Sequence, residues 1–387
     1  MFSPARRWPS VRSAFPARSR PIRIPRLPAI ALVAALALTA CGGEDPGAAA
    51  DRDPDPAPAA TATQVDDPEP SPEPSPSPTG PFAPLTGLET TAAAAARPPV
   101  VAKIENTNAA QPQAGLEDAD LVFEELVEGG VTRFFAVFHS TLPGNVGPIR
   151  SARLVDAALL PWLDGVLLYS GARDEVQAAI SRSGADLVIE GEPGFYRDRS
   201  RRAPHNLFVD AAAALDGVDR DDLAPPRWVV PFDAEPPAGE RDCDSPAAGC
   251  DGASLDVAMS RVYTSGWAYD PADGVYRRSQ NGRVQPTASG EPIGAANVVV
   301  LGVPVGAGGC CDSAGSRYVA TTTTGDGRAI VLRDGRWYEA TWRREAVTDP
   351  LELLLDGQPM ALAPGSTWVH LAPSGNLPAL EAESTTD

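Results

Sequence analysis

Positive charge is scarce in this 387-residue sequence, in which 32 Lys and Arg stand against 51 Asp and Glu for a formal net charge of −19. No Lys/Arg-rich arm follows the first 30 residues, so the usual electrostatic driving force for nucleic-acid binding is missing. No apolar run reaches the ~20 residues of a transmembrane helix. The 35 glycines show no three-residue period, which excludes collagen, and apolar runs at 121–127 and 298–303 exclude a wholly disordered chain.

The sequence also lacks the short motifs of several common chemistries. It contains no Gly-x-Ser-x-Gly nucleophile elbow, no His-Glu-x-x-His zinc motif and no Rossmann fingerprint. The glycine-rich segment 306–309 is not followed by the Lys-Ser/Thr pair of a phosphate-binding loop. We therefore expect no cofactor, and we favour a binding protein over an enzyme.

The N-terminal 40 residues have the composition of an export signal. Residues 1–26 contain seven Arg and no acid, and residues 27–38 are apolar. The run ends in Leu-Thr-Ala-Cys at 38–41, which resembles a bacterial lipobox, so we predict that residues 1–40 are removed and that Cys41 carries acyl chains such as palmitate. A general signal peptide is the alternative. The prediction places the protein on the outer face of the cytoplasmic membrane, held there by acyl chains because the rest of the chain is acidic.

Residues 41–84 predict an extended tether. The segment consists mainly of Pro, Ala, Asp, Glu, Ser and Thr, and its Pro-Ser and Pro-Glu repeats favour polyproline II. Phe82 is the one aromatic residue in it, so it cannot form a core. We expect the folded part to begin near Leu85.

Residues 85–223 predict a mixed α/β domain. Strand patterns cover 99–105, 121–127 and 131–138, with a hairpin turn at 128–130, and the later segments alternate between helix (153–163, 174–183) and strand (165–169, 185–190). The hairpin argues against a purely parallel sheet, because its two strands must be antiparallel.

The second half of the chain predicts strands. Residues 224–240 are rich in Pro and Asp and are interpreted as a linker, and residues 374–387 as a disordered tail. Between them, Asp-Gly pairs at 273, 326, 334 and 356 suit tight turns between short apolar runs. We expect 241–373 to form a mostly antiparallel β domain, so that the whole fold is of the α+β class.

Four cysteines remain after Cys41, namely Cys243, Cys250, Cys310 and Cys311. In an oxidising compartment an even number favours disulfides, and four cysteines allow three pairings. A Cys243–Cys250 bridge would leave two adjacent cysteines, whose disulfide strains the peptide between them, so bridges joining the two loops are an equally good interpretation. A metal site is the alternative, but the spacing fits no common zinc pattern and His is scarce, so we expect no metal.

Basic residues in the α/β domain predict a site for an anion. Arg150 and Arg153 follow a Gly-Pro turn at 147–148 that leads into the expected helix at 153–163, and Ser151 is expected to cap that helix. Residues 197–202 contain four Arg, and His205 and Asn206 follow. Guanidinium groups bind phosphate or carboxylate, whereas pairing with nearby acids is the alternative role. The predicted ligand-binding residues are Lys103, which is the only Lys of the chain, Arg133, Arg150, Ser151, Arg153, His205 and Asn206.

Acid–base candidates lie in the same domain. His205 could exchange a proton near neutral pH, and Glu124, Glu125 or Asp156 could assist it. In a strand, adjacent residues point to opposite faces, so Glu124 and Glu125 cannot serve one site.

Short segments spread over both halves of the chain carry a further signal. They lie at 84–88, 101–106, 111–116, 119–125, 128–134, 146–153 and 204–207, and again at 267–270, 276–278, 297–301 and 364–369. Together they resemble the YerB-like family of bacterial lipoproteins. The resemblance implies a two-domain envelope protein of unknown biochemical activity. The four later cysteines lie where the family is not expected to have them, which argues against a family-wide redox role.

Three functions remain open from the sequence. We favour a lipid-anchored protein whose arginine-lined site binds an anionic cell-wall component or an envelope protein. The first alternative is an envelope hydrolase or transferase that uses His205 with Glu124, Glu125 or Asp156. The second is a structural scaffold without a ligand pocket.

Overall fold

The computed structural model describes residues 80–219, 222–228, 230–237, 254–309, 315 and 317–378. The predicted signal peptide and nearly all of the tether lie outside these ranges, as do all five cysteines, so lipidation and disulfide pairing stay predictions. The predicted boundary between the domains also stays a prediction. Among the helices of the described residues, none is long and apolar enough to cross a membrane.

The first half of the described chain alternates between strands and short helices. It contains α1 (Ala92–Ala96), β1 (Val100–Glu105), β2 (Leu121–Leu126), β3 (Thr132–Phe138), α2 (Leu154–Leu159), β4 (Val166–Tyr169), α3 (Asp174–Ile180), β5 (Asp186–Ile189), β6 (Phe195–Arg197), β7 (Leu207–Val209) and α4 (Ala211–Asp216). A single 3-10 turn, Glu128–Gly130, joins β2 to β3. The strands β1 to β5 and the helices α2 and α3 lie where the sequence pattern predicted them, whereas α1, β6, β7 and α4 were not predicted.

The second half is almost entirely β-structure. It contains β8 (Ser254–Ala258), β9 (Thr264–Asp270), β10 (Val275–Gln280), β11 (Arg283–Val284), β12 (Gly294–Ala295), β13 (Asn297–Val303), β14 (Val305–Ala307), β15 (Val319–Thr321), β16 (Gly325–Arg333), β17 (Arg336–Arg344), β18 (Glu352–Leu355), β19 (Gln358–Pro359) and β20 (Thr367–Pro373). Asp334 and Gly335 both have positive φ between β16 and β17, as a tight hairpin turn requires. The predicted α+β class is confirmed.

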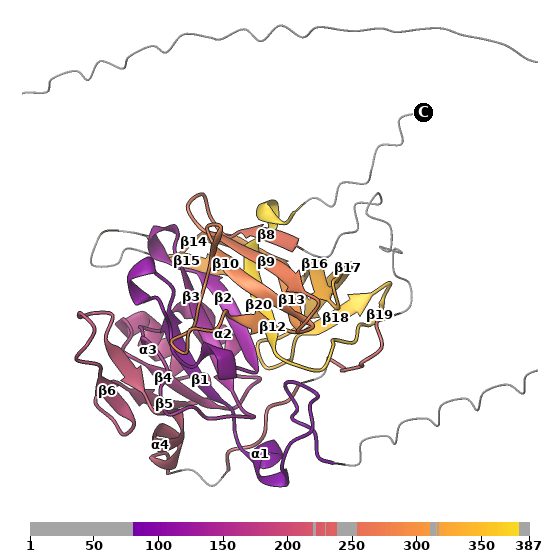
Figure 1. The fold of residues 1–387 in the computed structure, drawn as a ribbon. Helices are drawn as coiled ribbons and strands as arrows, with labels where there is room; N and C mark the ends of the chain where they lie inside the picture. Colours follow the sequence, from indigo (N-terminus) through magenta and orange to yellow (C-terminus); the bar gives the residue numbers. More distant parts are fainter. Residues whose placement is uncertain are drawn as a thin grey trace, which may run out of the picture. The chain divides into compact units, whose positions relative to one another are not determined.

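One large sheet runs through both halves of the chain (Figure 1). Its order is β19-β18-β17-β16-β13-β20-β2-β3-β1-β4-β5. The two halves join where β20 pairs in parallel with β2, with Leu121 opposite Thr367 and Phe123 opposite Val369. On its other side β20 pairs in parallel with β13. The last of the described strands therefore lies in the middle of the sheet.

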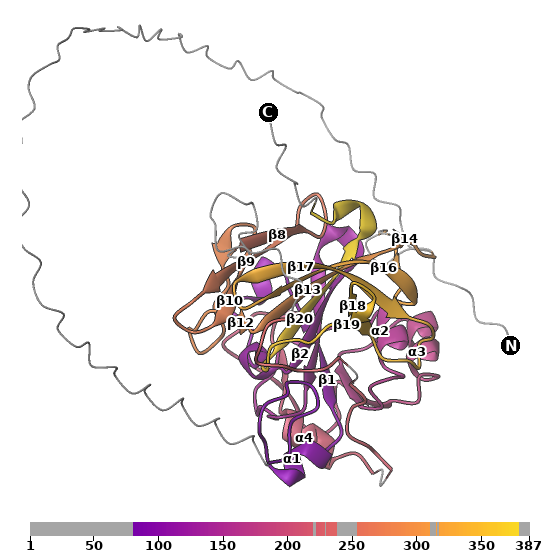
Figure 2. The ribbon, with the colours of Figure 1, turned by 90° about the vertical axis from the view of Figure 1, so that its right-hand side faces the viewer.

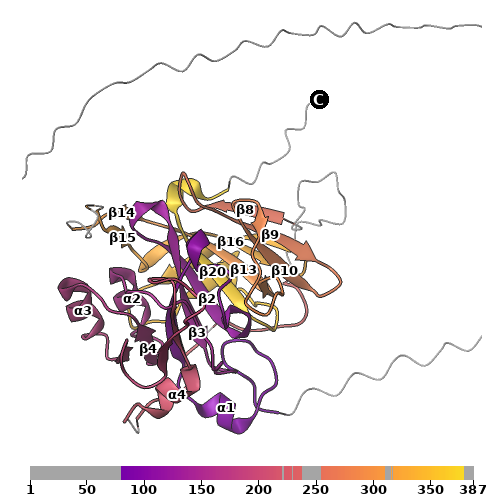
Figure 3. The same cartoon turned by 60° about the vertical axis from the view of Figure 1, so that its left-hand side comes forward.

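The two faces of the large sheet are covered differently (Figures 2 and 3). Helices α2 and α3 pack on one face, where their apolar residues join a core with Val101, Phe123 and Phe135. The second sheet, β11-β10-β9-β8 with β12, packs on the other face, where Trp267 joins a core with Phe134. In Figure 2 the strands β13, β20 and β2 lie between these two layers.

Helix α2 differs from its prediction at both ends. It begins after Arg153, whose backbone N donates to Asp156 Oδ2 at 2.6 Å, so Arg153 and not Ser151 occupies the N-cap position. The Ser151 hydroxyl instead lies 3.4 Å from the Ser170 hydroxyl. The helix ends at Leu159, two residues before Pro161, which has no backbone N–H to donate to a helical hydrogen bond. The expectation of a Ser151 cap was wrong.

Candidate functional site

Charged side chains gather at one end of β1, β2 and β3, on the face that α2 covers. Strand alternation places Lys103 and Glu105 of β1 on the same face as Val101, and Glu125 of β2 on the same face as Phe123. Arg133 of β3 lies opposite both Glu105 and Glu125 in the ladder. Three neighbouring strands thus bring four charges together without any contribution from loops.

The innermost of these charges form a buried triad of Lys103, Glu125 and Asp156. The Lys103 ammonium pairs with Glu125 and, at 2.8 Å, with Asp156 Oδ1, and all three side chains are fully buried. Burial and the neighbouring Asp156 raise the pKa of Glu125 to about 8, against the pull of Lys103. Glu125 Oε2 has no hydrogen-bond partner in the described part of the chain. Because all three side chains are fully buried, none of them can touch a ligand from solvent.

A second group, here called the arginine cluster, lies next to the triad and reaches the surface. It consists of Glu105, Glu128, Arg133, Arg150, Arg153 and His205. Arg153 donates to Glu128 Oε2 through Nε at 2.8 Å and Nη2 at 2.7 Å, and Arg150 Nε lies 2.8 Å from Glu105 Oε2. The side chains of Arg150 and Arg153 are 19% and 18% exposed.

Arg133 has a different environment from the other two arginines of the cluster. Its Nη1 donates to the backbone oxygen of Ser151 at 2.9 Å, and Arg153 Nη1 donates to the same oxygen at 3.2 Å. Burial and the neighbouring Arg153 lower the pKa of Arg133 to about 10. Among the described residues no carboxylate forms an ion pair with Arg133. The guanidinium is thus a partly buried cation held by a carbonyl.

His205 joins the arginine cluster through Glu105. Its Nδ1 lies 2.8 Å from Glu105 Oε2 and 3.1 Å from Arg150 Nη2, and the imidazole is 26% exposed. Burial opposes ionisation of Glu105, but hydrogen bonds from Arg150, His205 and Thr107 outweigh it and keep its pKa below the ordinary value. Glu105 was not among the residues predicted from the sequence. It lies two residues after Lys103 in the same strand, so both side chains are on one face.

Asn206, the neighbour of His205, takes no part in this cluster. Its Oδ1 accepts a hydrogen bond from Arg197 Nη1 at 2.7 Å on the loop between β6 and β7. Arg197 also pairs with Glu190. Asn206 therefore orders the loop rather than facing the arginines of the cluster.

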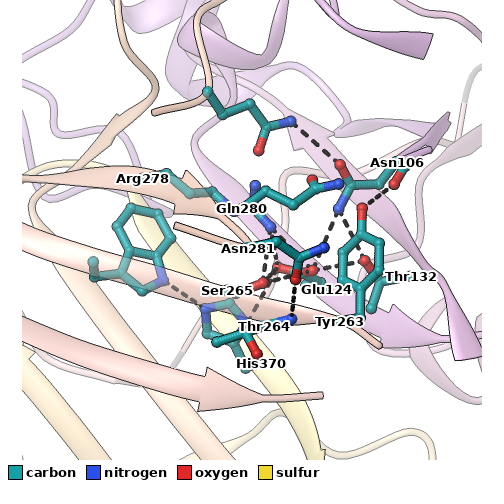
Figure 4. Close-up of polar contacts among 12 residues, drawn as sticks. Asn106, Glu124, Thr132, Tyr263, Thr264, Ser265, Arg278, Gln280, Asn281 and His370 are labelled. Carbon is teal, nitrogen blue, oxygen red and sulfur yellow. Dashed lines mark hydrogen bonds and ion pairs between the residues drawn. The ribbon is translucent and has the colours of Figure 1, made fainter. Parts of the chain in front are cut away.

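Glu124 lies on the opposite face of β2, in a group that we call the interdomain cluster (Figure 4). It accepts hydrogen bonds from Thr132 at 2.7 Å, from Ser265 at 2.9 Å and from Arg278 Nη2 at 2.9 Å. Burial would raise the pKa of Glu124, but Arg278 and His370 outweigh it and hold that pKa far below its ordinary value. The side chains of Glu124, Arg278 and His370 are fully buried.

His370 and Arg278 complete the interdomain cluster from the second half of the chain. Trp267 Nε1 donates to His370 Nε2 at 2.8 Å, so the proton of the neutral imidazole is on Nδ1, 3.3 Å from Glu124 Oε2. The Arg278 guanidinium lies 5.1 Å from the ring centre of Phe134 and 5.3 Å from that of Trp368. The cluster joins β2 to β9, β10 and β20, and it has no access to solvent.

These positions decide which predicted site residues belong together. Arg133, Arg150, Arg153 and His205 converge, whereas Glu124 is held on the other face by Arg278. His205 contacts Glu105, whereas Glu124, Glu125 and Asp156, the carboxylates expected to assist it in an enzyme, are buried in other ion pairs. Lys103, predicted as a ligand-binding residue, is likewise buried.

Three hollows of the described chain lie away from the arginine cluster. One apolar pocket is lined by Leu159 and Trp342, one surface hollow lies beside β5 and another beside β18. The described ranges contain no group of three or more His, Asp, Glu or Cys that could hold a metal ion.

Comparisons with known proteins extend over both halves of the chain. The model described as Protein of unknown function (DUF3048) N-terminal domain matches residues 85–224, and that of the DUF3048 C-terminal domain matches residues 255–369. The chain is 29% identical over 301 residues, 75% of this chain and 86% of the relative, to a Bacillus subtilis (strain 168) protein named "Putative lipoprotein YerB". The crystal structure of the YerB protein from Bacillus subtilis is similar, with a TM-score of 0.62 and 25% identity over 75% of this chain and 95% of that one.

Proposed function

Because the chain belongs to the DUF3048 family of proteins of unknown function, matching both of its domains, we propose that it is a lipid-anchored envelope protein that binds an anionic ligand through the arginine cluster. The relative's name, a lipoprotein, supports the anchoring half of the proposal. The ligand-binding half rests on the geometry around Arg133.

Arg133 is the observation that carries the binding proposal. Arg150 and Arg153 already have carboxylate partners, Glu105 and Glu128, whereas the hydrogen bond of Arg133 goes to a neutral backbone oxygen. A partly buried guanidinium that forms no ion pair with a described carboxylate has donors to offer to an incoming oxyanion. A bound anion would also relieve the repulsion between Arg133 and its neighbour Arg153.

The charges of the site favour an anion over a cation. The arginine cluster, which reaches the surface, contains three arginines, Arg133, Arg150 and Arg153, and two carboxylates, Glu105 and Glu128. Its arginines therefore outnumber its carboxylates by one. This local surplus contrasts with the net charge of −19 on the chain.

Anion binding is tested by isothermal titration calorimetry of the full chain, purified in detergent, with inorganic phosphate as the probe. We expect wild type to bind phosphate and Arg133→Gln to lose at least tenfold in affinity, because one charge-assisted contact contributes about 1.5–3 kcal/mol. The matched control is Arg328→Gln, an exposed arginine on β16 that pairs with Glu339. Equal phosphate binding by wild type and Arg133→Gln would contradict the proposal.

The anchor is tested separately at Cys41. Membrane fractions from cells fed labelled palmitate should contain labelled wild-type protein, and the Cys41→Ala variant should be unlabelled. An unchanged label on the variant would exclude lipidation at this residue and leave the binding proposal untouched.

A further inference from the structure

The hairpin of β6 and β7 extends the basic surface of the arginine cluster. β6 lies at the periphery of the molecule in Figure 1, and the loop that follows it leads to His205. Residues 197–202 of that loop contain four arginines in a chain that is otherwise strongly acidic. The roles of these four arginines differ, and the difference indicates what the surface can bind.

Two of the four arginines hold the loop in place. Arg201 donates to the backbone oxygen of Ala110 at 2.9 Å and to that of Pro112, and its guanidinium lies 5.2 Å from the ring centre of Phe208. Arg197 pairs with Glu190 and with Asn206. The loop is therefore fastened to the body of the protein and keeps its shape without a ligand.

The other two arginines, Arg199 and Arg202, point their charge at solvent. Both are exposed, and neither has an ion pair or side-chain hydrogen bond to any residue that the structure describes. The nearest acid in sequence, Asp198, is occupied by the backbone N and the hydroxyl of Ser200 and lies 3.8 Å from Arg201. These two charges are not needed to neutralise the loop.

The exposed arginines continue directly from the arginine cluster. The backbone N of His205 donates to the backbone oxygen of Arg202 at 3.0 Å, so one turn connects them. Three residues span at most ~10 Å and six residues at most ~20 Å between Cα atoms, which limits the distances of Arg202 and Arg199 from His205. Arg202 and Arg199 therefore lie within ~20 Å of His205 along the backbone, close enough for one polymer to meet them and the arginine cluster together.

We propose that this surface binds a linear polymer that carries a phosphate on each repeating unit. One phosphate would occupy the arginine cluster, where Arg133, Arg150 and Arg153 come from different parts of the fold. The oxygens of a phosphate are arranged tetrahedrally around phosphorus rather than in the one plane of a carboxylate, which suits donors that approach from several sides. Further phosphates along the polymer would meet Arg202 and Arg199. This inference rests on the proposed function and adds the class of ligand.

The test compares three probes on the full chain in detergent by calorimetry: inorganic phosphate, linear polyphosphate and polyglutamate. We expect polyphosphate to bind wild type at least 100-fold more tightly than phosphate, because linked anions occupy neighbouring sites at high effective concentration. The Arg199→Gln/Arg202→Gln variant should lose at least tenfold of the polyphosphate affinity and bind phosphate as wild type does. Both side chains are exposed, so the variant should unfold at the wild-type temperature.

A control variant and the outcomes separate the two proposals. Arg328→Gln/Arg343→Gln removes two exposed, ion-paired arginines from β16 and β17 and should bind all three probes as wild type does. This inference alone would be overturned if phosphate binding depends on Arg133 but polyphosphate binds no more tightly than phosphate. It would also be overturned if the Arg199→Gln/Arg202→Gln variant binds polyphosphate as tightly as wild type does. Polyglutamate binding as tightly as polyphosphate would overturn the assignment to phosphate. If wild type does not bind phosphate, or if Arg133→Gln binds it equally well, the proposed function is overturned as well.

Discussion

Replacing Glu124 by Gln removes the counter-charge of a buried arginine while preserving shape. Arg278 Nη2 lies 2.9 Å from Glu124 Oε2 and 3.1 Å from Oε1, and both side chains are fully buried. Two further nitrogens of Arg278, Nε and Nη1, have no acceptor in the described ranges. The guanidinium therefore depends on one carboxylate, and Gln would leave its charge unpaired between Phe134 and Trp368.

The expected loss of stability is large for a single isosteric substitution. Breaking a buried ion pair by removing one partner costs about 3–5 kcal/mol, compared with a total of about 5–15 kcal/mol for a typical domain. The hydrogen bonds from Thr132 and Ser265 also weaken, because a neutral amide oxygen replaces a carboxylate. We therefore expect Glu124→Gln to lower the free energy of unfolding by about 3–5 kcal/mol.

Urea unfolding followed by tryptophan fluorescence measures this loss directly. Trp267 and Trp368 lie within the cluster, with ring centres 5.3 Å apart, so their emission reports on its disruption. The control is Glu339→Gln, which breaks an ion pair with Arg328 whose side chains are 49% and 52% exposed, and which should cost at most about 1 kcal/mol.

A double variant distinguishes an unpaired charge from a general loss of packing. Glu124→Gln/Arg278→Met removes the arginine as well, so it should be more stable than Glu124→Gln alone by about 2 kcal/mol or more. If Glu124→Gln differs from wild type no more than Glu339→Gln does, the assignment of the interdomain cluster as an electrostatic lock is refuted.

Three other substitutions test the buried charges. Lys103→Met leaves Glu125 and Asp156 without their counter-charge and should lower the free energy of unfolding in urea by about 3–5 kcal/mol. The pKa of Glu125 is raised from 4.5 to about 8 by folding, so between pH 4.5 and about 8 the folded state binds a proton that the unfolded state releases. The free energy of unfolding of wild type should therefore decline as the pH rises through this window. Glu125→Gln, which mimics the protonated acid, should remove that decline in urea titrations across the window; an unchanged decline contradicts the assignment. Arg344→Met should cost about 2–4 kcal/mol of unfolding free energy, because this buried arginine donates to the backbone oxygens of Ala158, Val347 and Asp349, and a cost under about 0.5 kcal/mol would show these bonds to be dispensable.

Local patterns in the sequence predicted the elements of the fold well. The apolar runs at 121–127 and 131–138 became β2 and β3, and the Asp-Gly pair at 334 became the turn between β16 and β17. Each of these signals depends on residues within a few positions of one another. The pairing of β20 with β2 depends on residues more than 240 positions apart, and periodicity in a single strand says nothing about its neighbours in the sheet.

The candidate site shows the same division. The convergence of Arg150, Arg153 and His205 was predicted from charge composition, and the opposite orientation of Glu124 and Glu125 from strand alternation. Glu105, the partner of both Arg150 and His205, was missed because a single acid in a strand has no distinguishing pattern. The interdomain cluster was missed because Arg278 and His370 come from separate strands of the second half.

The position of β20 has a consequence for the order in which the chain can fold. Synthesis releases the N-terminal strands first, yet the sheet position between β2 and β13 stays vacant until residues 367–373 have emerged. Until then β2 and β13 each present an unpaired apolar edge, the kind of surface on which chains associate. A chain that stops before residue 367 would keep the other strands of both halves and lose the strand that joins them. The C-terminal segment therefore governs whether the newly made protein forms one continuous sheet or two sheets with exposed, aggregation-prone edges.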